Sequence, residues 1–341
     1  MDDAGASLHG FAASGLVVVG AAAASFVLSL LLYPLLRRHA LAHPNARSSH
    51  KIPTPQGGGI AVIAAAIGAV VVSTLASRTG FTQSLELVLG ATLLIAAVGA
   101  VDDLRSIPVV PRLILQAVAV VMVVVALPAD LRILPSLPFW LERALAVLAV
   151  LWFVNLTNFM DGLDWMTVAE VVPVSAGLAV FGLMGALPRE ATTMALALGG
   201  AMIGFAPINR PVARMFLGDV GSLPIGLMLG WLLFVLAANG HMAAAILLPL
   251  YYLADATITL ARRLARGERI SQAHRSHFYQ RATDRGYRVT QIVGRVFVLN
   301  IALLMLAAAS VLTASLLLQA VALIAGAGLV AWLLYRFEAK A

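Results

Sequence analysis

The chain contains no cysteine among its 341 residues, and only 11% of its residues are charged. The absence of cysteine excludes disulfide bonds, thiolate metal sites and cysteine nucleophiles. Soluble domains carry about 25% charged residues, so the low charged fraction excludes an ordinary soluble fold. Hydrophobic residues make up 61% of the chain, and its mean hydropathy is +0.95. Apolar side chains must therefore face lipid as well as a protein core.

The apolar runs predict an all-α, polytopic transmembrane helical bundle. An α-helix needs about 20 apolar residues to cross a bilayer. The first run follows an acidic start and is too long for a signal peptide, so we expect it to be the first span. No segment between runs is long enough for a soluble domain, so residues 1–341 form one integral membrane domain. We predict about eleven spans, near 11–36, 57–76, 85–101, 110–128, 139–157, 165–187, 190–208, 221–238, 241–261, 294–312 and 315–334.

The distribution of lysine and arginine predicts the orientation of these spans. With the amino terminus outside and the carboxyl terminus inside, the inner loops and tail hold 19 of the 23 Lys and Arg residues. Inner loops of membrane proteins carry such an excess. The net charge of +7 is therefore attributed to these loops, and we expect no nucleic-acid partner. The outer side keeps only Arg78, Arg132, Arg143 and Arg189.

Paired carboxylates end the third predicted span on its inner side. Charge near lipid is costly, so clustered carboxylates at helix ends indicate a functional site. Asp102 and Asp103 are adjacent and repel one another, and a divalent cation beside them would stabilise the pair. A solvated helix end explains such a pair equally well.

A polar stripe ends the fifth predicted span. Asn155, Asn158, Asp161 and Asp164 recur every three positions and lie near one face of a helix. Amides followed by carboxylates suit a metal, a metal-bound phosphate or a sugar. Gly162 would relax the helix or admit a ligand to the backbone. A stripe of interhelical hydrogen bonds accounts well for Asn155 but poorly for Asp161.

A third motif, Phe-Leu-Gly-Asp-Val-Gly-Ser over 216–222, precedes the eighth predicted span. Asp219 or Ser222 would serve simply as a helix cap. Glycines on both sides of an aspartate at a helix amino terminus also describe a site for a phosphate and its metal. Both interpretations remain open for this motif alone.

Two inner loops carry further polar candidates. In the long basic loop 262–295, His274 and His277 share a face if the segment is helical. Together with Arg275 they would form an anion-binding site. Binding to lipid headgroups explains the arginines of that loop but not its histidines. In the loop 37–56, Arg47 and Lys51 precede proline and glycine residues that exclude a regular helix through 53–59.

Asp255 lies inside the ninth predicted span, about 10 Å from its inner end at 1.5 Å per residue. An intramembrane carboxylate faces the bundle and pairs with a partner or contacts a substrate, and both roles fit here. Eleven spans with an intramembrane carboxylate also permit a secondary transporter. Transporter sites lie near the bilayer midplane in repeated halves, whereas here the carboxylates cluster at inner helix ends and no repeat is visible. These features favour an enzyme.

Together and in this order, the motifs resemble those of the polyprenyl-phosphate N-acetylhexosamine-1-phosphate transferases, a family of integral membrane enzymes. The resemblance runs from His43 to about Tyr287. The segment His-Arg-Ser-His resembles the branch that begins O-antigen and related surface polysaccharides. Trp165 departs from the pattern, because the family usually places glycine there. The matching motifs are Pro-Asn-x-Arg at 44–47, Pro-x-Pro-x-Gly-Gly-Gly at 53–59, the paired aspartates 102–103, Asn-x-x-Asn-Phe-x-Asp-Gly-x-Asp at 155–164, Gly-Asp-x-Gly-Ser at 218–222, and the histidine loop 274–277.

The resemblance implies transfer of N-acetylhexosamine 1-phosphate from a UDP-N-acetylhexosamine to undecaprenyl phosphate, with release of UMP. It implies Mg²⁺, with Mn²⁺ as a substitute, a bacterial inner-membrane location and a possible homodimer. Because a phosphate monoester has a second pKa of about 6, little deprotonation is needed, and we favour direct attack over an aspartyl-phosphate. The implied metal ligands are Asp219 with Asp103 or Asp102; the implied catalytic residues are Asp102, Asp103, Asp161, Asp164, His274 and His277; the implied substrate-binding residues are Arg47, Lys51, Asn155, Asn158 and Arg275.

Overall fold

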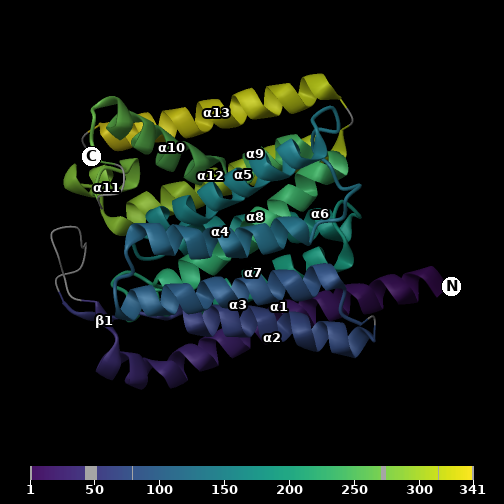
Figure 1. The fold of residues 1–341 in the computed structure, drawn as a ribbon, viewed down its shortest axis with the longest axis horizontal. Helices are drawn as coiled ribbons and strands as arrows, with labels where there is room; N and C mark the ends of the chain where they lie inside the picture. The colour runs from purple at the N-terminus through teal and green to yellow at the C-terminus, as the bar shows by residue number, and fades with distance from the viewer. Residues whose placement is uncertain (1, 43–51, 79, 270–273, 314, 340–341) are drawn as a thin grey trace.

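In the computed structural model the chain is described over residues 2–42, 52–78, 80–269, 274–313 and 315–339, with side chains from residue 12 onward. These residues form long helices that run side by side, as Figure 1 shows. The all-α prediction is confirmed for this part of the chain. The helices are α1 (Asp2–His39), α2 (Gly59–Ser77), α3 (Gln83–Leu104), α4 (Val109–Val125), α5 (Phe139–Met160), α6 (Met166–Leu183), α7 (Arg189–Phe205), α8 (Asp219–Leu236), η1 (Ala237–His241), α9 (Met242–Leu247), α10 (Leu250–Ala265), α11 (Phe278–Asp284), α12 (Val289–Leu312) and α13 (Leu316–Glu338).

Eight stretches of helix in the described residues are long and apolar enough to cross a membrane. Helix α4 is apolar but shorter. The chain begins at one end of the bundle and finishes at the other (Figure 1), as an odd number of crossings requires. Eleven crossings and the outside amino terminus stay predictions. The eight stretches are Ala12–His39, Gly59–Ser77, Gln83–Leu104, Phe139–Met160, Met166–Leu183, Asp219–Leu247, Val289–Leu312 and Leu316–Glu338.

The ninth predicted span is wrong as one continuous helix. Non-helical dihedrals at Asn239 and Gly240, where φ is +90° at the glycine, interrupt the chain between α8 and α9. Pro249, which lacks an N–H group, then precedes the first residue of α10. The predicted segment 241–261 is therefore divided between α9 and α10.

Helix α8 lies at the centre of the bundle and is buried along nearly its whole length. Its first turn meets α2 and α3 at glycines. A Cβ atom at Gly59 would lie 2.2 Å from the Cα of Gly221, and one at Gly99 would lie 2.3 Å from the carbonyl oxygen of Asp219. Because only glycine permits such close approach, the first residues of α2 and the last turns of α3 touch the amino terminus of α8.

A short ribbon ties the segment before α2 to the segment before α8. Strand β1 (Leu41–Ala42) pairs antiparallel with β2 (Thr54–Pro55), and Gln56 pairs with Phe216 in a parallel bridge. The backbone nitrogen of Phe216 donates to the carbonyl oxygen of Pro55 at 2.8 Å. The proline- and glycine-rich segment 53–59 thus carries Gln56 to the start of α8.

Candidate active site

Asp103, at the end of α3, caps the amino terminus of α8. Its Oδ1 accepts a hydrogen bond from the backbone nitrogen of Asp219 at 2.8 Å, and its Oδ2 accepts one from Val220 at 3.1 Å. The side-chain amide of Gln56 also donates to Asp103 Oδ1. Helix amino termini favour a carboxylate in this position. Asp103 therefore positions Asp219, and its predicted role as a metal ligand stays a prediction.

Asp102 and Asp219 lie on either side of an arginine. Arg112 Nη1 donates to Asp102 Oδ2 at 2.5 Å and lies 3.9 Å from Asp219 Oδ2. The other oxygen of Asp219 accepts a hydrogen bond from Asn158 Nδ2 at 2.8 Å. Arg112 was not among the predicted site residues. Its signal in the sequence is weak, since it is one basic residue in the first turn of the apolar helix that follows the paired aspartates.

The loop between α5 and α6 presents Asp161 and Asp164. Asp161 Oδ1 accepts a hydrogen bond from the hydroxyl of Thr167. Asp164 is buried, and its Oδ2 accepts one from the backbone nitrogen of Ala213 at 3.0 Å. Burial, reinforced by the negative charge of Asp219 and its neighbours, raises the pKa of Asp161 to about 8. A bound cation would favour the ionised form of this carboxyl group and offset the negative charge that it then carries.

Trp165 keeps the turn for which the family usually supplies a glycine. Its φ is +64°, in the left-handed region, which costs a residue with a Cβ atom roughly 1–2 kcal/mol. Two hydrogen bonds hold it there, from its backbone nitrogen to Asn209 Oδ1 at 2.8 Å and from its indole nitrogen to the carbonyl oxygen of Ala206 at 2.6 Å. These two contacts hold Trp165 in a left-handed turn.

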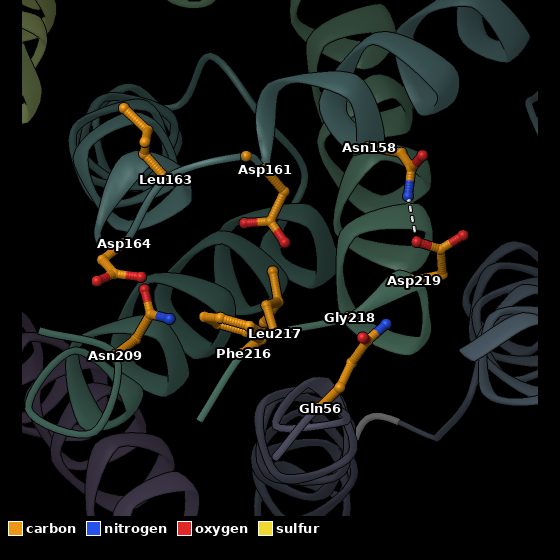
Figure 2. A pocket seen from close by; sticks show the side chains of 11 residues that line it. Gln56, Asn158, Asp161, Leu163, Asp164, Asn209, Phe216, Leu217, Gly218 and Asp219 are labelled. Carbon is orange, nitrogen blue, oxygen red and sulfur yellow. Dashed lines mark hydrogen bonds between the residues drawn. The ribbon is translucent and has the colours of Figure 1, made fainter. Parts of the chain in front are cut away.

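A cavity of about 180 Å³ joins these groups at one end of the bundle. Figure 2 shows Asn158 and Asp219 paired on one side of it, and Asp161 between them and Asp164. Asn155 lies outside the cavity, because its amide donates to Gln116 Oε1 of α4 at 2.9 Å, as the interhelical interpretation expects. The polar lining consists of Gln56, Asn158, Asp161, Asp164, Asn209 and Asp219.

The histidine segment is not helical, which corrects the predicted arrangement. Helix α11 begins at Phe278, with His277 as its N-cap, so His274 and His277 do not share a helix face. Their rings instead stack with centroids 4.9 Å apart. Arg275 Nη2 donates to Thr283 Oγ1 at 2.7 Å and lies 3.3 Å from Asp284 Oδ1. The predicted role of these side chains in holding a phosphate stays a prediction.

Asp255 is fully buried and organises this segment. Its Oδ1 lies 3.1 Å from His277 Nδ1 and accepts a hydrogen bond from the backbone nitrogen of Phe278, also at 3.1 Å. Its Oδ2 accepts one from the backbone nitrogen of Tyr279 at 3.3 Å. Of the two roles left open for Asp255, the structure supports that of a partner. A carboxylate at Nδ1 orients an imidazole and leaves Nε2 for other contacts.

Tyr279 joins the histidine segment to the aspartate loop. Its hydroxyl donates to the carbonyl oxygen of Phe159 at 2.9 Å. A Cβ atom at Gly162 would lie 2.2 Å from that hydroxyl, so Gly162 makes room for Tyr279. Arg47 and Lys51 lie outside the described residues.

The side chains that line the cavity include oxygen donors of the kind that Mg²⁺ prefers. Among the described residues, no three His, Cys, Asp or Glu side chains are grouped so as to hold a metal. Mg²⁺ usually takes one or two protein carboxylates together with substrate phosphates and water. The cavity supplies the carboxylates of Asp161 and Asp219 beside amide side chains. These residues fit a cation that is shared with a bound diphosphate.

Residues 85–237 match the model of glycosyl transferase family 4. Through these residues, which make up a little less than half of the chain, the protein is similar to this family. The match covers every carboxylate of the cavity but not the histidine segment. The resemblance inferred from the motifs is thereby confirmed.

Several proteins to which the chain is similar are named as phosphotransferases or sugar 1-phosphate transferases. The chain is 31% identical over 216 residues to a decaprenyl-phosphate N-acetylglucosaminephosphotransferase of Mycobacterium tuberculosis, covering 57% of this chain and 52% of the relative. It is 25% identical over 279 residues to a probable undecaprenyl-phosphate N-acetylglucosaminyl 1-phosphate transferase of Bacillus subtilis, covering 77% and 76%. It is 34% identical over 198 residues to a phospho-N-acetylmuramoyl-pentapeptide-transferase of Synechococcus, covering 52% of each. The chain thus spans about half the length of the mycobacterial relative.

Proposed function

We propose that the protein transfers N-acetylhexosamine 1-phosphate from a UDP-sugar to undecaprenyl phosphate. The observation that carries the proposal is the meeting of Asp161, Asp219 and the Asp102–Arg112 pair at one end of a membrane bundle. Clustered carboxylates suit a nucleotide diphosphate with its cation, and a membrane bundle suits a lipid acceptor. The names of the relatives support the same reaction class.

In the proposed reaction, an oxygen of the acceptor phosphate attacks the phosphorus that carries the sugar. The bond from that phosphorus to the bridging oxygen breaks, and UMP leaves with the bonding electrons. The products are a sugar-diphospho-undecaprenol and UMP. Asp219 and Asp161 would hold Mg²⁺, which when bound neutralises the diphosphate and orients it for in-line attack.

Direct attack is favoured over a covalent aspartyl intermediate. Asp103 is engaged by three donors, two of them backbone nitrogens of α8, and is a poor nucleophile in that state. Asp102 is paired with Arg112 at 2.5 Å. The acceptor phosphate is mostly dianionic at pH 7, so it needs no strong base. Asp102 and Arg112 are therefore assigned to positioning.

We further propose a biosynthetic pathway and a membrane location for this reaction. The segment from His274 to His277 supports the branch that starts O-antigen and related surface polysaccharides, with the active site on the cytoplasmic face of the bacterial inner membrane. The sugar is an N-acetylhexosamine such as GlcNAc, GalNAc, FucNAc or QuiNAc. The cavity lies at helix ends and not within the bundle, which favours a transferase over a secondary transporter.

The released nucleotide tests this proposal. Purified protein in lipid nanodiscs is incubated with Mg²⁺, undecaprenyl phosphate and each UDP-N-acetylhexosamine in turn, and nucleotides are separated by chromatography. We expect UMP in equal amount to the lipid product for at least one sugar. Release of UDP would instead show attack at the anomeric carbon, and the proposal would then be wrong.

A further inference from the structure

A groove between α12 and α13 lies apart from the catalytic cavity. It encloses about 500 Å³, and none of the described residues lines both it and the catalytic cavity. Both helices are long apolar stretches, and α13 runs along the edge of the bundle in Figure 1. Trp332 and Val298 on its walls are 60% and 69% exposed, as expected of side chains that face lipid. The groove is therefore open to the hydrocarbon of a bilayer.

One cation, Arg295, lies in this apolar groove. Its Nη1 atom is buried and has no hydrogen-bond partner. Its guanidinium carbon lies 4.6 Å from the ring centroid of Tyr287, which holds the group in place. Arg295 is six residues into α12, about 9 Å along the helix. A buried guanidinium nitrogen without a partner is costly unless an anion pairs with it.

The protein itself supplies no such anion among the described residues. No ion pair within 4.0 Å joins Arg295 to a carboxylate in this part of the chain. Glu338, at the end of α13, already pairs with Arg262 at 2.6 Å and with Arg281 at 3.0 Å. The charge at this end of the groove is therefore positive and lacks a protein counter-ion.

We propose that the groove binds one anionic phospholipid of the cytoplasmic leaflet. Its phosphate pairs with the guanidinium of Arg295, and an acyl chain lies against α12 and α13. Arginine is well suited to phosphate oxygens, and anionic lipids of the inner leaflet are attracted to such basic positions. Gly294 leaves space for the acyl chain, since a Cβ atom on this residue would meet nothing within 4 Å. Among the residues that the structure describes, no carboxylate lines the groove, so none competes with a lipid phosphate for Arg295 there.

Two variants test separately the charge of Arg295 and the open space beside Gly294. Arg295→Gln removes the cation, with Arg336→Gln on exposed α13 surface as its control. Gly294→Leu fills the groove and leaves Arg295 in place. Its control is Gly328→Leu, because Gly328 also has open space around it but does not line the groove. The four variants are purified in detergent, checked for folding by thermal unfolding, and titrated with phosphatidylglycerol, phosphatidylcholine or undecaprenyl phosphate under native mass spectrometry.

The expected result is one tightly held phosphatidylglycerol, bound in preference to phosphatidylcholine. Its affinity falls about fivefold in Arg295→Gln and in Gly294→Leu, while both controls bind as wild type does. Equal binding of phosphatidylcholine, unchanged binding in the two groove variants, or an equal loss in the controls would overturn the proposal. Displacement of phosphatidylglycerol by equimolar undecaprenyl phosphate would make the acceptor the occupant and would also contradict it. If Arg295→Gln fails to fold, the affinity of Gly294→Leu for phosphatidylglycerol decides the test.

Discussion

Asp103 accepts a hydrogen bond from the backbone nitrogen of Asp219 at 2.8 Å, across 116 residues of sequence. The two carboxylates therefore have different structural roles, although both belong to motifs that suggest a metal site. Asp103 is turned toward the amino terminus of α8, whereas Asp219 lines the cavity. This division makes the two residues separable by mutation.

We predict that Asp219→Asn abolishes turnover with little change in stability, and that Asp103→Asn destabilises the fold. Loss of a helix cap typically costs about 1 kcal/mol, and the new amide cannot accept all three hydrogen bonds of Asp103. Activity is measured at saturating Mg²⁺ and stability by thermal unfolding in detergent. Asp130→Asn, in an exposed loop at the other end of α4, is the control. Activity of Asp219→Asn within a few-fold of wild type would remove Asp219 from the metal site.

We predict that Arg112→Gln binds Mg²⁺ more tightly than wild type. Arg112 brings a positive charge to within 3.9 Å of Asp219 Oδ2, and its removal leaves Asp219 and Asp102 with less compensation. The Mg²⁺ concentration that gives half of the thermal stabilisation should fall at least about threefold. This figure is kept small because Arg112 is partly exposed and solvent screens its charge. Arg105→Gln, at an exposed arginine between α3 and α4, should leave the midpoint unchanged. A higher midpoint in Arg112→Gln would contradict this electrostatic assignment.

We predict that Mg²⁺ affinity rises as the pH increases from 6.5 to 9. Burial and neighbouring carboxylates raise the pKa of Asp161 to about 8, so below that pH its carboxyl group carries a proton that a cation must displace. The gain in melting temperature on adding Mg²⁺ should therefore be larger at pH 9 than at pH 6.5. Asp161→Asn has no proton to lose and should flatten this dependence. An equally steep dependence in Asp161→Asn would assign the titration to another group.

We predict that Asp255 acts on turnover through His277. Asp255→Asn should lower turnover about tenfold or more, because an amide cannot accept from His277, Phe278 and Tyr279 together. The double variant with His277→Gln should then be no slower than His277→Gln alone, as for residues that act as one unit. Thr259→Val is the control, since Thr259 also contacts Asp255, at 3.3 Å. Additive losses in the double variant would show an independent, structural role for Asp255.

We predict that the catalytic end of the bundle faces the cytoplasm. The chain has no cysteine, so single cysteines report their side without background. Leu104→Cys and Arg266→Cys should resist an impermeant thiol reagent in intact cells and react after permeabilisation, whereas Ser136→Cys should react from outside. All three positions are exposed. Labelling of Leu104→Cys and Arg266→Cys from outside would reverse the orientation.

Hydropathy and motif spacing alone predicted the all-α membrane class of this protein and the carboxylates that line its cavity. A bilayer demands apolar segments of a set length, so the runs of the sequence correspond to helices, apart from the divided segment 241–261. Local pattern also indicated Asp161, Asp164 and Asp219, which line the cavity. Charged side chains at the ends of apolar runs are costly near lipid, so their presence indicates a functional role.

Only the tertiary structure decided what each polar side chain contacts. Asp103 as a cap, Arg112 between two aspartates and Asp255 behind His277 all depend on segments that are distant in sequence. Trp165 in the left-handed region is held by Ala206 and Asn209, some forty residues away. Hydrogen bonds and ion pairs act over a few ångströms, so the partner of a polar group is determined by how helices pack. The sequence shows that a carboxylate needs a partner, and the packing of the bundle selects which partner it has.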